Sequence, residues 1–371
     1  MAEFAIGGQI VINPGHSLGI FHYNIPAALM LMNISSKTRK DIRFITVMVS
    51  ISTVSGIVFA SITAGGLSPS VGGLLGFLIS FFCALGNFTF LQRFRNLPFT
   101  AFLLLKTAYF TSVAATVIVA RLFVSDQIVK NLPSKANILI VAILLTLGIS
   151  FIATFALMLR RMLGQNALLN FFTGRYFKPV EEERIFMFLD LSSSTQIAEK
   201  IGHLKFHVFL NEFFYDITDA ILGAEGEIYK YVGDEVIVSW RLTDGIRNSR
   251  CIQSFFEIQK MIEEKKDKYL NKFGYIPHFR AGIHCGPVIV GEMGDYKREI
   301  GFFGDTVNTT ARIQEACKEY KRDLLISSEF LKNLSLGSDY SVNSVGEIGL
   351  KGKEILIELF GIEKRRKETT L

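Results

Sequence analysis

The sequence predicts two parts of different fold class, an N-terminal α-helical transmembrane bundle and a C-terminal α+β domain. Up to about residue 160 the apolar residues form long runs, whereas beyond that point charged residues recur every few positions. The chain has 371 residues, of which 49% are hydrophobic, and its length allows two or three domains. This uneven distribution indicates a membrane half followed by a soluble half.

Four segments of the first half are long and apolar enough to cross a bilayer, which takes roughly 20 residues. They are approximately Phe44–Ala64, Val71–Leu91, Ala101–Ala120 and Ile138–Leu159, and Lys106 is the one charged residue within them. Basic residues cluster before the first span, between the second and third, and after the fourth. The positive-inside rule then puts both ends of the unit in the cytoplasm. We therefore predict an integral protein of the inner or plasma membrane with a cytoplasmic C-terminal domain.

The domain boundaries follow from the same changes in composition. Residues 1–35 are apolar but interrupted by Gly, Pro, Asn and His, which favours an interfacial or partly inserted segment over a fifth span. Residues 36–160 form the predicted membrane domain. Residues 161–182 form a linker helix and hinge, because the helical spacing ends at Gly174 and Pro179. The soluble domain covers 183–363, and 364–371 is a basic tail.

Charge and cysteine content exclude several classes. The net charge of +6 arises largely beside the apolar runs, where basic residues set membrane topology, so no nucleic-acid partner is expected. The four cysteines have no paired spacing and suggest neither a zinc site nor a disulfide framework. The spans contain no chain of ionisable residues of the kind found in pumps and carriers.

The soluble half alternates strand and helix signals. "RIFMFLD" is a short apolar run typical of a buried strand, and residues 192–222 have helical spacing. "EIYKYV" and "EVIVSW" flank a Gly-Asp turn and predict a hairpin. A helix from about Ile246 to Leu270 and a strand through "HFRAGIHCG" follow. The order β-α-β-β-α-β is that of a ferredoxin-like sheet with helices on one face.

Two aspartates stand where this topology brings strand ends together. Asp190 ends the first strand directly before "LSSST", where a helix N-terminus offers N–H groups suited to phosphate. Asp234 lies in the hairpin turn, and the hairpin can lie beside the first strand. Each residue alone is better explained as an ordinary strand end or turn. Together, two carboxylates beside a phosphate-binding turn fit a two-metal site for in-line displacement.

A third group lies in "GFFGDTVNTTARI". Asn308 and Arg312 are four residues apart on a predicted helix and share one of its faces. The planar guanidinium of Arg312 suits phosphoryl oxygens, and the Asn308 amide can orient a ribose.

The motifs "FLDLSSST", "KYVGDE", "GDTVNTTARI" and "GLKGK", in this order and spacing, resemble those of the class III nucleotidyl cyclases. The resemblance covers roughly Glu183 to Glu363, about half of the chain. It implies a homodimer with two interfacial sites. Each site would convert a nucleoside triphosphate into a 3′,5′-cyclic monophosphate and pyrophosphate.

The resemblance also implies individual roles. Asp190 and Asp234 resemble the metal-binding aspartates, assisted by the Leu191 carbonyl, for two Mg²⁺ or Mn²⁺ ions per site. Asn308 resembles the ribose-orienting residue and Arg312 the residue that stabilises the transition state, both supplied by the opposite subunit. The remaining candidates contact substrate, namely Lys230 at the purine, and Ser193, Ser194, Thr195, Lys297, Arg298 and Lys351 at the triphosphate.

One position departs from the family pattern. Seven residues before Asn308, adenine-specific members usually have Asp, Thr or Ser and many guanine-specific members have Cys, but this chain has Gly301. Lys230 favours ATP, because guanine-selective members tend to carry Glu there. We therefore predict a membrane-anchored adenylate cyclase for intracellular signalling, with ATP, a second copy of the chain and membrane lipid as partners.

Three alternatives stay open at this point. A guanylate cyclase would make cyclic GMP from GTP, and Gly301 keeps this reading open. A catalytically silent membrane receptor would use its cyclase-like domain only to dimerise, although the presence of Asp190, Asp234 and Arg312 argues against it. A phosphatase of the strand-end aspartate type would need a second Asp where Ser192 stands.

Overall fold

The computed structural model describes residues 69–88, 97–124, 173–349 and 356–365, with scattered positions between 46 and 57, at 94, and between 144 and 171. The predictions for residues 1–35 and for Lys351 lie outside the described residues. The first and fourth predicted spans lie largely outside them too.

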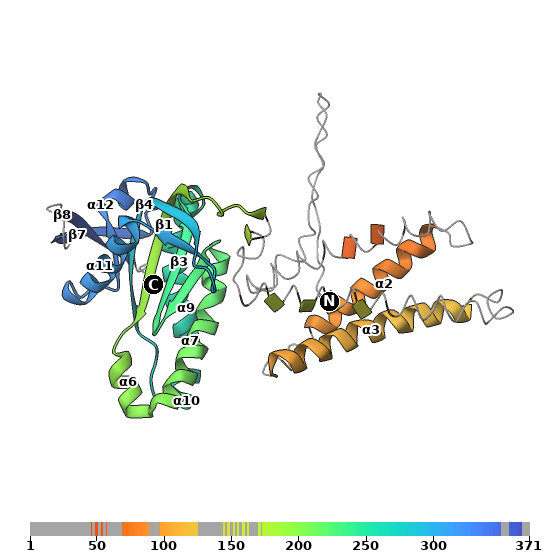
Figure 1. Ribbon diagram of the computed structural model, residues 1–371. Coiled ribbons are helices and arrows are strands. Elements are labelled where there is room, and N and C mark those ends of the chain that lie inside the picture. The colour runs from red at the N-terminus through yellow and green to blue at the C-terminus, as the bar shows by residue number, and fades with distance from the viewer. Residues whose placement is uncertain are drawn as a thin grey trace, which may run out of the picture. The chain divides into compact units, whose positions relative to one another are not determined.

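Two described helices overlap the second and third predicted spans. These are α2 (Pro69–Phe88) and α3 (Phe99–Val124), which pack against each other (Figure 1). The Tyr109 hydroxyl of α3 donates a hydrogen bond to the Phe82 carbonyl of α2 at 3.0 Å. Its ring occupies the space that a Cβ at Gly86 would need. Within the described residues, one helix, through its segment Phe99–Thr116, is long and apolar enough to cross a membrane.

The C-terminal domain is built on one mixed eight-stranded sheet in the order β2-β3-β1-β4-β6-β8-β7, with β5 paired to β4. The strands are β1 (Val180–Leu191), β2 (Glu227–Val232), β3 (Glu235–Arg241), β4 (Phe279–Met293), β5 (Glu299–Phe303), β6 (Leu324–Ser327), β7 (Tyr340–Gly349) and β8 (Leu356–Lys364). β1 lies inside the sheet, antiparallel to both β3 and β4, whereas β4 and β6 run parallel. The first four strands therefore have the predicted ferredoxin-like order, and β1 begins inside the segment predicted as hinge.

Helices lie on both sides of this sheet. The principal ones are α6 (Ser194–Ile201), α7 (His203–Gly223), α9 (Arg250–Glu264), α10 (Lys266–Phe273) and α11 (Asp305–Glu319), with the short α8 (Leu242–Ile246), η4 (Arg247–Ser249) and α12 (Ser328–Lys332). Figure 1 shows α7 and α9 on one side of β1 and β3 and α11 on the other. The prediction of a single helix over residues 192–222 is wrong in one respect. Gly202, at φ +82°, interrupts it and separates α6 from α7.

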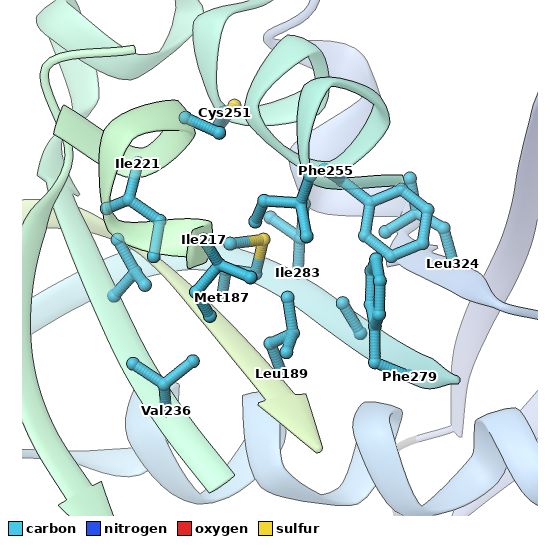
Figure 2. Close-up of a cluster of buried hydrophobic side chains, with 14 of the residues drawn as sticks. Met187, Leu189, Ile217, Ile221, Val236, Cys251, Phe255, Phe279, Ile283 and Leu324 are labelled. Atoms are coloured by element: carbon cyan, nitrogen blue, oxygen red, sulfur yellow. The ribbon is translucent and has the colours of Figure 1, made fainter. Parts of the chain in front are cut away.

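Two apolar layers hold the sheet between these helices. Met187 and Leu189 of β1 pack with Ile217 and Ile221 of α7 and Phe255 of α9 (Figure 2). On the other face, a second cluster contains Phe186, Phe188, Ile237, Val288 and Val290, with Val307 and Ala311 of α11 against it. Because β1 is covered on both faces, its residues form a continuous apolar run rather than an alternating one.

Candidate active site

The β2–β3 hairpin brings Asp234 to the end of β1. Gly233 and Asp234 form a two-residue turn in which Gly233 has φ +64°, a conformation that suits glycine. Across the next strand pair, Asp190 lies opposite Glu235. Asp190 and Asp234 lie close enough for the Asp234 carboxylate to raise the pKa of Asp190. The structure thus brings together the two aspartates that the sequence suggested.

This end of the sheet concentrates negative charge. Burial, together with the charge and hydrogen bond of Asp234, raises the pKa of Asp190 to about 6, although Gln314 and the Leu191 N–H donate to its carboxylate. Burial also raises the pKa of Glu235 to about 7, and the charges of Asp190, Asp234 and Glu315 add to the effect. Partly buried carboxylates that repel one another are stabilised by a bound cation.

The donors present here fit a magnesium-like ion. Among the described residues there is no group of three or more His, Cys, Asp or Glu side chains arranged to hold a metal. Mg²⁺ is nevertheless commonly held by one or two carboxylates, its other ligands being substrate phosphates and water. Asp190 and Asp234 supply two such carboxylates, and both are oxygen donors suited to a hard cation.

A cleft of about 340 Å³ lies beyond the end of β1, and neither Asp190 nor Asp234 is among the residues that line it. Arg280 of β4, the register partner of Asp190, lines it together with Ser192, Ser193 and Lys200. The Ser192 N–H donates to the His278 carbonyl at 2.7 Å, which ties the turn after β1 to the start of β4. The backbone of Ser193 has a left-handed conformation, with φ 60°. Asp323 also lines the cleft, but the two cationic side chains beside a serine turn suit an anion such as a triphosphate.

The sequence reasoning missed Arg280. Arg280 lies across from Asp190 because β4 is hydrogen-bonded to β1, and this pairing joins segments that are distant in the chain. The available sequence signal for Arg280 was a basic residue near the start of the predicted strand "HFRAGIHCG". Of the predicted hydroxyl residues, Ser193 lines the cleft, whereas Ser194 and Thr195 belong to the first turn of α6.

Lys230 lies in a second cleft, of about 300 Å³. Its ammonium group is 3.6 Å from a Glu299 carboxylate oxygen. Lys297 and Arg298, predicted as phosphate contacts, line the same cleft. Lys297 pairs with Glu299 at 3.7 Å, and Arg298 pairs with Glu292 at 3.1 Å. These residues therefore surround the predicted purine side of the site.

Asn308 and Arg312 are exposed on α11. Arg312 donates to Glu315 at 2.6 Å. Within the part of the chain that the structure describes, neither residue forms a hydrogen bond or ion pair with Asp190 or Asp234. One chain thus carries the aspartate pair and, without contact to it, an exposed face of α11 with Asn308 and Arg312.

These features coincide with a known family. Residues 178–364 match the model of the adenylate and guanylate cyclase catalytic domain, about half of the chain. The chain belongs to this family. A curated relative, adenylate cyclase 2 of Rhizobium meliloti (strain 1021), is 34% identical over 81% of this chain and 84% of its own length.

Other cyclases match over a smaller share of the chain. The adenylate cyclase of Anabaena cylindrica is 27% identical over 48% of this chain and 36% of its own length. Human retinal guanylyl cyclase 2 is 31% identical over 45% of this chain and 15% of its own length. A solved bacterial light-regulated adenylyl cyclase superposes with a TM-score of 0.52 at 19% identity, covering 59% of this chain and 64% of that one. That similarity shows the fold.

Proposed function

We propose that this cyclase is a membrane-anchored adenylate cyclase that converts ATP into 3′,5′-cyclic AMP and pyrophosphate for intracellular signalling. The observation that carries the proposal is the Asp190–Asp234 pair beside the Arg280 cleft, in a chain of the cyclase family. The extent of its similarity to an adenylate cyclase, 81% of this chain, supports ATP as substrate.

Asp190, Asp234 and the Leu191 carbonyl are the proposed ligands of two divalent ions, Mg²⁺ or Mn²⁺. When bound, these ions lower the pKa of the ribose 3′-hydroxyl and neutralise charge on the triphosphate. The chain's own carboxylates fix the place of this charge at the end of β1. The hydroxyl then gives its proton to water or to a substrate phosphate and attacks the α-phosphorus in line, and the bond from that phosphorus to the leaving pyrophosphate breaks.

The remaining residues bind and orient the nucleotide. Arg280 neutralises charge on the triphosphate in its cleft, and the Ser193 hydroxyl donates to it, with Ser194, Thr195 and Lys351 as further proposed contacts. Lys297 and Arg298, which line the Lys230 cleft, are proposed to contact the triphosphate from that side. Arg312 stabilises the charge that develops on the α-phosphate, and Asn308 orients the ribose. Lys230 contacts the purine.

We further propose that the active form is a homodimer. Asn308 and Arg312 are exposed and do not contact the aspartates of their own chain. Residues from a second copy would complete each site, giving two sites per dimer. The apolar helix α3 and the four apolar sequence segments support an anchor in the inner or plasma membrane, in contact with lipid, with the catalytic domain in the cytoplasm.

The test is cyclic-nucleotide formation by the full-length protein in detergent, with ATP or GTP and with Mg²⁺ or Mn²⁺. Asp234→Asn should abolish activity, because it removes one of two metal-binding carboxylates without changing side-chain size. Glu225→Asn, which alters an exposed carboxylate of the Arg247 and Arg250 ion pairs, is the control. Cyclic GMP as the main product would move the assignment to guanylate cyclase, the reading that Gly301 keeps open. A dimer that forms neither product would point to an absent activating signal or to the silent receptor.

A further inference from the structure

The helix α11 is fastened to β4 at two points along its length. Near its start, the Thr306 hydroxyl donates to the Pro287 carbonyl at 2.8 Å. About three turns later, the Cys317 thiol donates to the Ala281 carbonyl at 3.3 Å. Between these points the helix packs on the apolar cluster of β1, β3 and β4. The helix therefore has a fixed place on the sheet.

Gly282 of β4 lets this helix approach the sheet closely at Gln314. A Cβ at position 282 would lie 2.4 Å from the backbone nitrogen of Gln314 and 2.8 Å from its Cα. Both distances are far shorter than an ordinary contact of about 3.5–4.0 Å, so a side chain here would push the helix away. Gly282 pairs with Phe188 of β1. Asp190 is two residues further along β1 and shares the face of Phe188, which is the face that α11 covers.

The side chain of Gln314 reaches the end of β1 from this position. Its amide donates a hydrogen bond to the Asp190 carboxylate, and the Leu191 N–H donates another. Asp234 and Glu235, which lie beside Asp190, are both acidic. The amide is thus a neutral donor placed among carboxylates, and it belongs to the same chain as they do.

Stability gives little reason for this hydrogen bond. Gln314 is half-buried, and α11 already holds its place through the Thr306 and Cys317 contacts. A neutral hydrogen bond at such a position adds little to folding, because both groups would otherwise bond to water. A carboxylate that binds a metal, by contrast, gains from a neighbour that fixes its orientation. Loss of such a neighbour typically costs about 10–100-fold in metal affinity.

We propose that Gln314 is a positioning residue that holds the Asp190 carboxylate in the orientation needed to bind a divalent ion. A hydrogen bond to one lone pair of the carboxylate limits its rotation and leaves the other lone pairs for the ion. Gln314 itself touches neither the ion nor the nucleotide. This inference rests on the proposed function, since it assigns the support of a metal-binding carboxylate. It also gives α11 two tasks, because the same helix presents Asn308 and Arg312.

The test measures metal binding without turnover. Mn²⁺ is added to full-length protein in detergent, in the absence of nucleotide, and free Mn²⁺ is followed by electron paramagnetic resonance. Asp190→Asn gives the background from other carboxylates. Gln314→Met keeps the side-chain size and removes the donor, so it should raise the dissociation constant for Mn²⁺ about 10-fold or more. Gln259→Met, at a half-buried glutamine of α9 on the other side of the sheet, is the matched control and should leave it unchanged.

The metal dependence of the rate separates positioning from damage to the fold. Cyclic AMP formation by Gln314→Met should need about 10-fold more Mn²⁺ for its half-maximal rate and should approach the wild-type rate at saturating Mn²⁺, because excess ion compensates for weaker binding. A structural role would instead lower both the urea midpoint and the rate at every Mn²⁺ concentration, and that result overturns the inference. Gln314→Ala repeats the measurement if the methionine variant folds poorly, since alanine favours the helix most.

Two further outcomes bear on the inference directly. Unchanged Mn²⁺ affinity in the Gln314 variants, or wild-type Mn²⁺ binding that does not depend on Asp190, overturns it. Weakened Mn²⁺ binding in Gln314→Met supports the inference even if the wild-type sample makes no cyclic AMP. That second observation would count against the proposed function alone.

Discussion

Replacing Arg184 with methionine should destabilise the catalytic domain strongly. The side chain is 3% exposed, and its guanidinium lies 2.9 Å from Glu182, 3.1 Å from Glu227 and 5.1 Å from the centre of the Phe302 ring. Removing one member of a buried ion cluster leaves carboxylates without compensation, at a cost of about 3–5 kcal/mol. Glu182 keeps the Tyr176 hydroxyl at 2.9 Å and the Arg175 guanidinium at 3.6 Å, and Glu227 is 36% exposed, so the lower value is expected.

The assay uses the chain's single tryptophan. Trp240 lies in β3, is 1% exposed and donates to the Ala224 carbonyl, so its fluorescence reports unfolding of this domain alone. With a urea dependence of about 2 kcal/mol per M, a loss of 3 kcal/mol lowers the midpoint by about 1.5 M. Arg322→Met, at an exposed ion pair with Glu363, should lower it by less than about 0.5 M.

The same cluster provides an internal check. Changing Glu182 and Glu227 to Gln in the Arg184→Met background removes the uncompensated charges and should recover most of the lost stability. A midpoint shift below about 0.3 M for Arg184→Met alone would refute the reasoning, because the guanidinium would then contribute no more than a surface charge does.

Three further predictions concern other parts of the domain. Gly202→Ala should lower stability by about 1 kcal/mol, seen as a lower urea midpoint, because φ is +82° there and no neighbouring atom lies within 4 Å of the added Cβ. Burial alone raises the pKa of Asp216, but hydrogen bonds from Lys265, Tyr269 and Lys268 outweigh it and hold the pKa below 3.8. The stability that the Asp216 carboxylate gives to the fold is therefore fully present well above pH 3.8 and is lost as pH falls through the lowered pKa. The urea midpoints of wild type and Asp216→Asn should accordingly converge in acid. Arg280→Met should weaken binding of tripolyphosphate to the full-length protein about 10-fold or more, measured calorimetrically, since a charged hydrogen bond is worth roughly 1.5–3 kcal/mol.

The sequence predicted the parts of the fold that depend on local patterns. The apolar run of β1 and the hairpin turn at Gly233 placed Asp190 and Asp234 correctly, because strand pairing and a two-residue turn leave few alternatives. The break at Gly202 was missed because apolar residues recur at helical spacing on both sides of it. The strands after β4 were not predicted either, and their places depend on contacts distant in the chain.

The two halves of the nucleotide site differ in how far a sequence can reveal them. Asp234 is placed by the turn itself, so its neighbour Asp190 follows from the strand order. Lys230, only four residues earlier, is placed by a bulge that leaves no mark in the hydrophobic pattern, and its partner Glu299 comes from a strand that pairs with β4. One short hairpin thus carries two charges to different neighbours, Asp234 to β1 and Lys230 to β5. The charges of Lys230 and Asp234 in "KYVGDE" are explained by this division, since neither side chain enters the core that the hairpin's alternate residues fill.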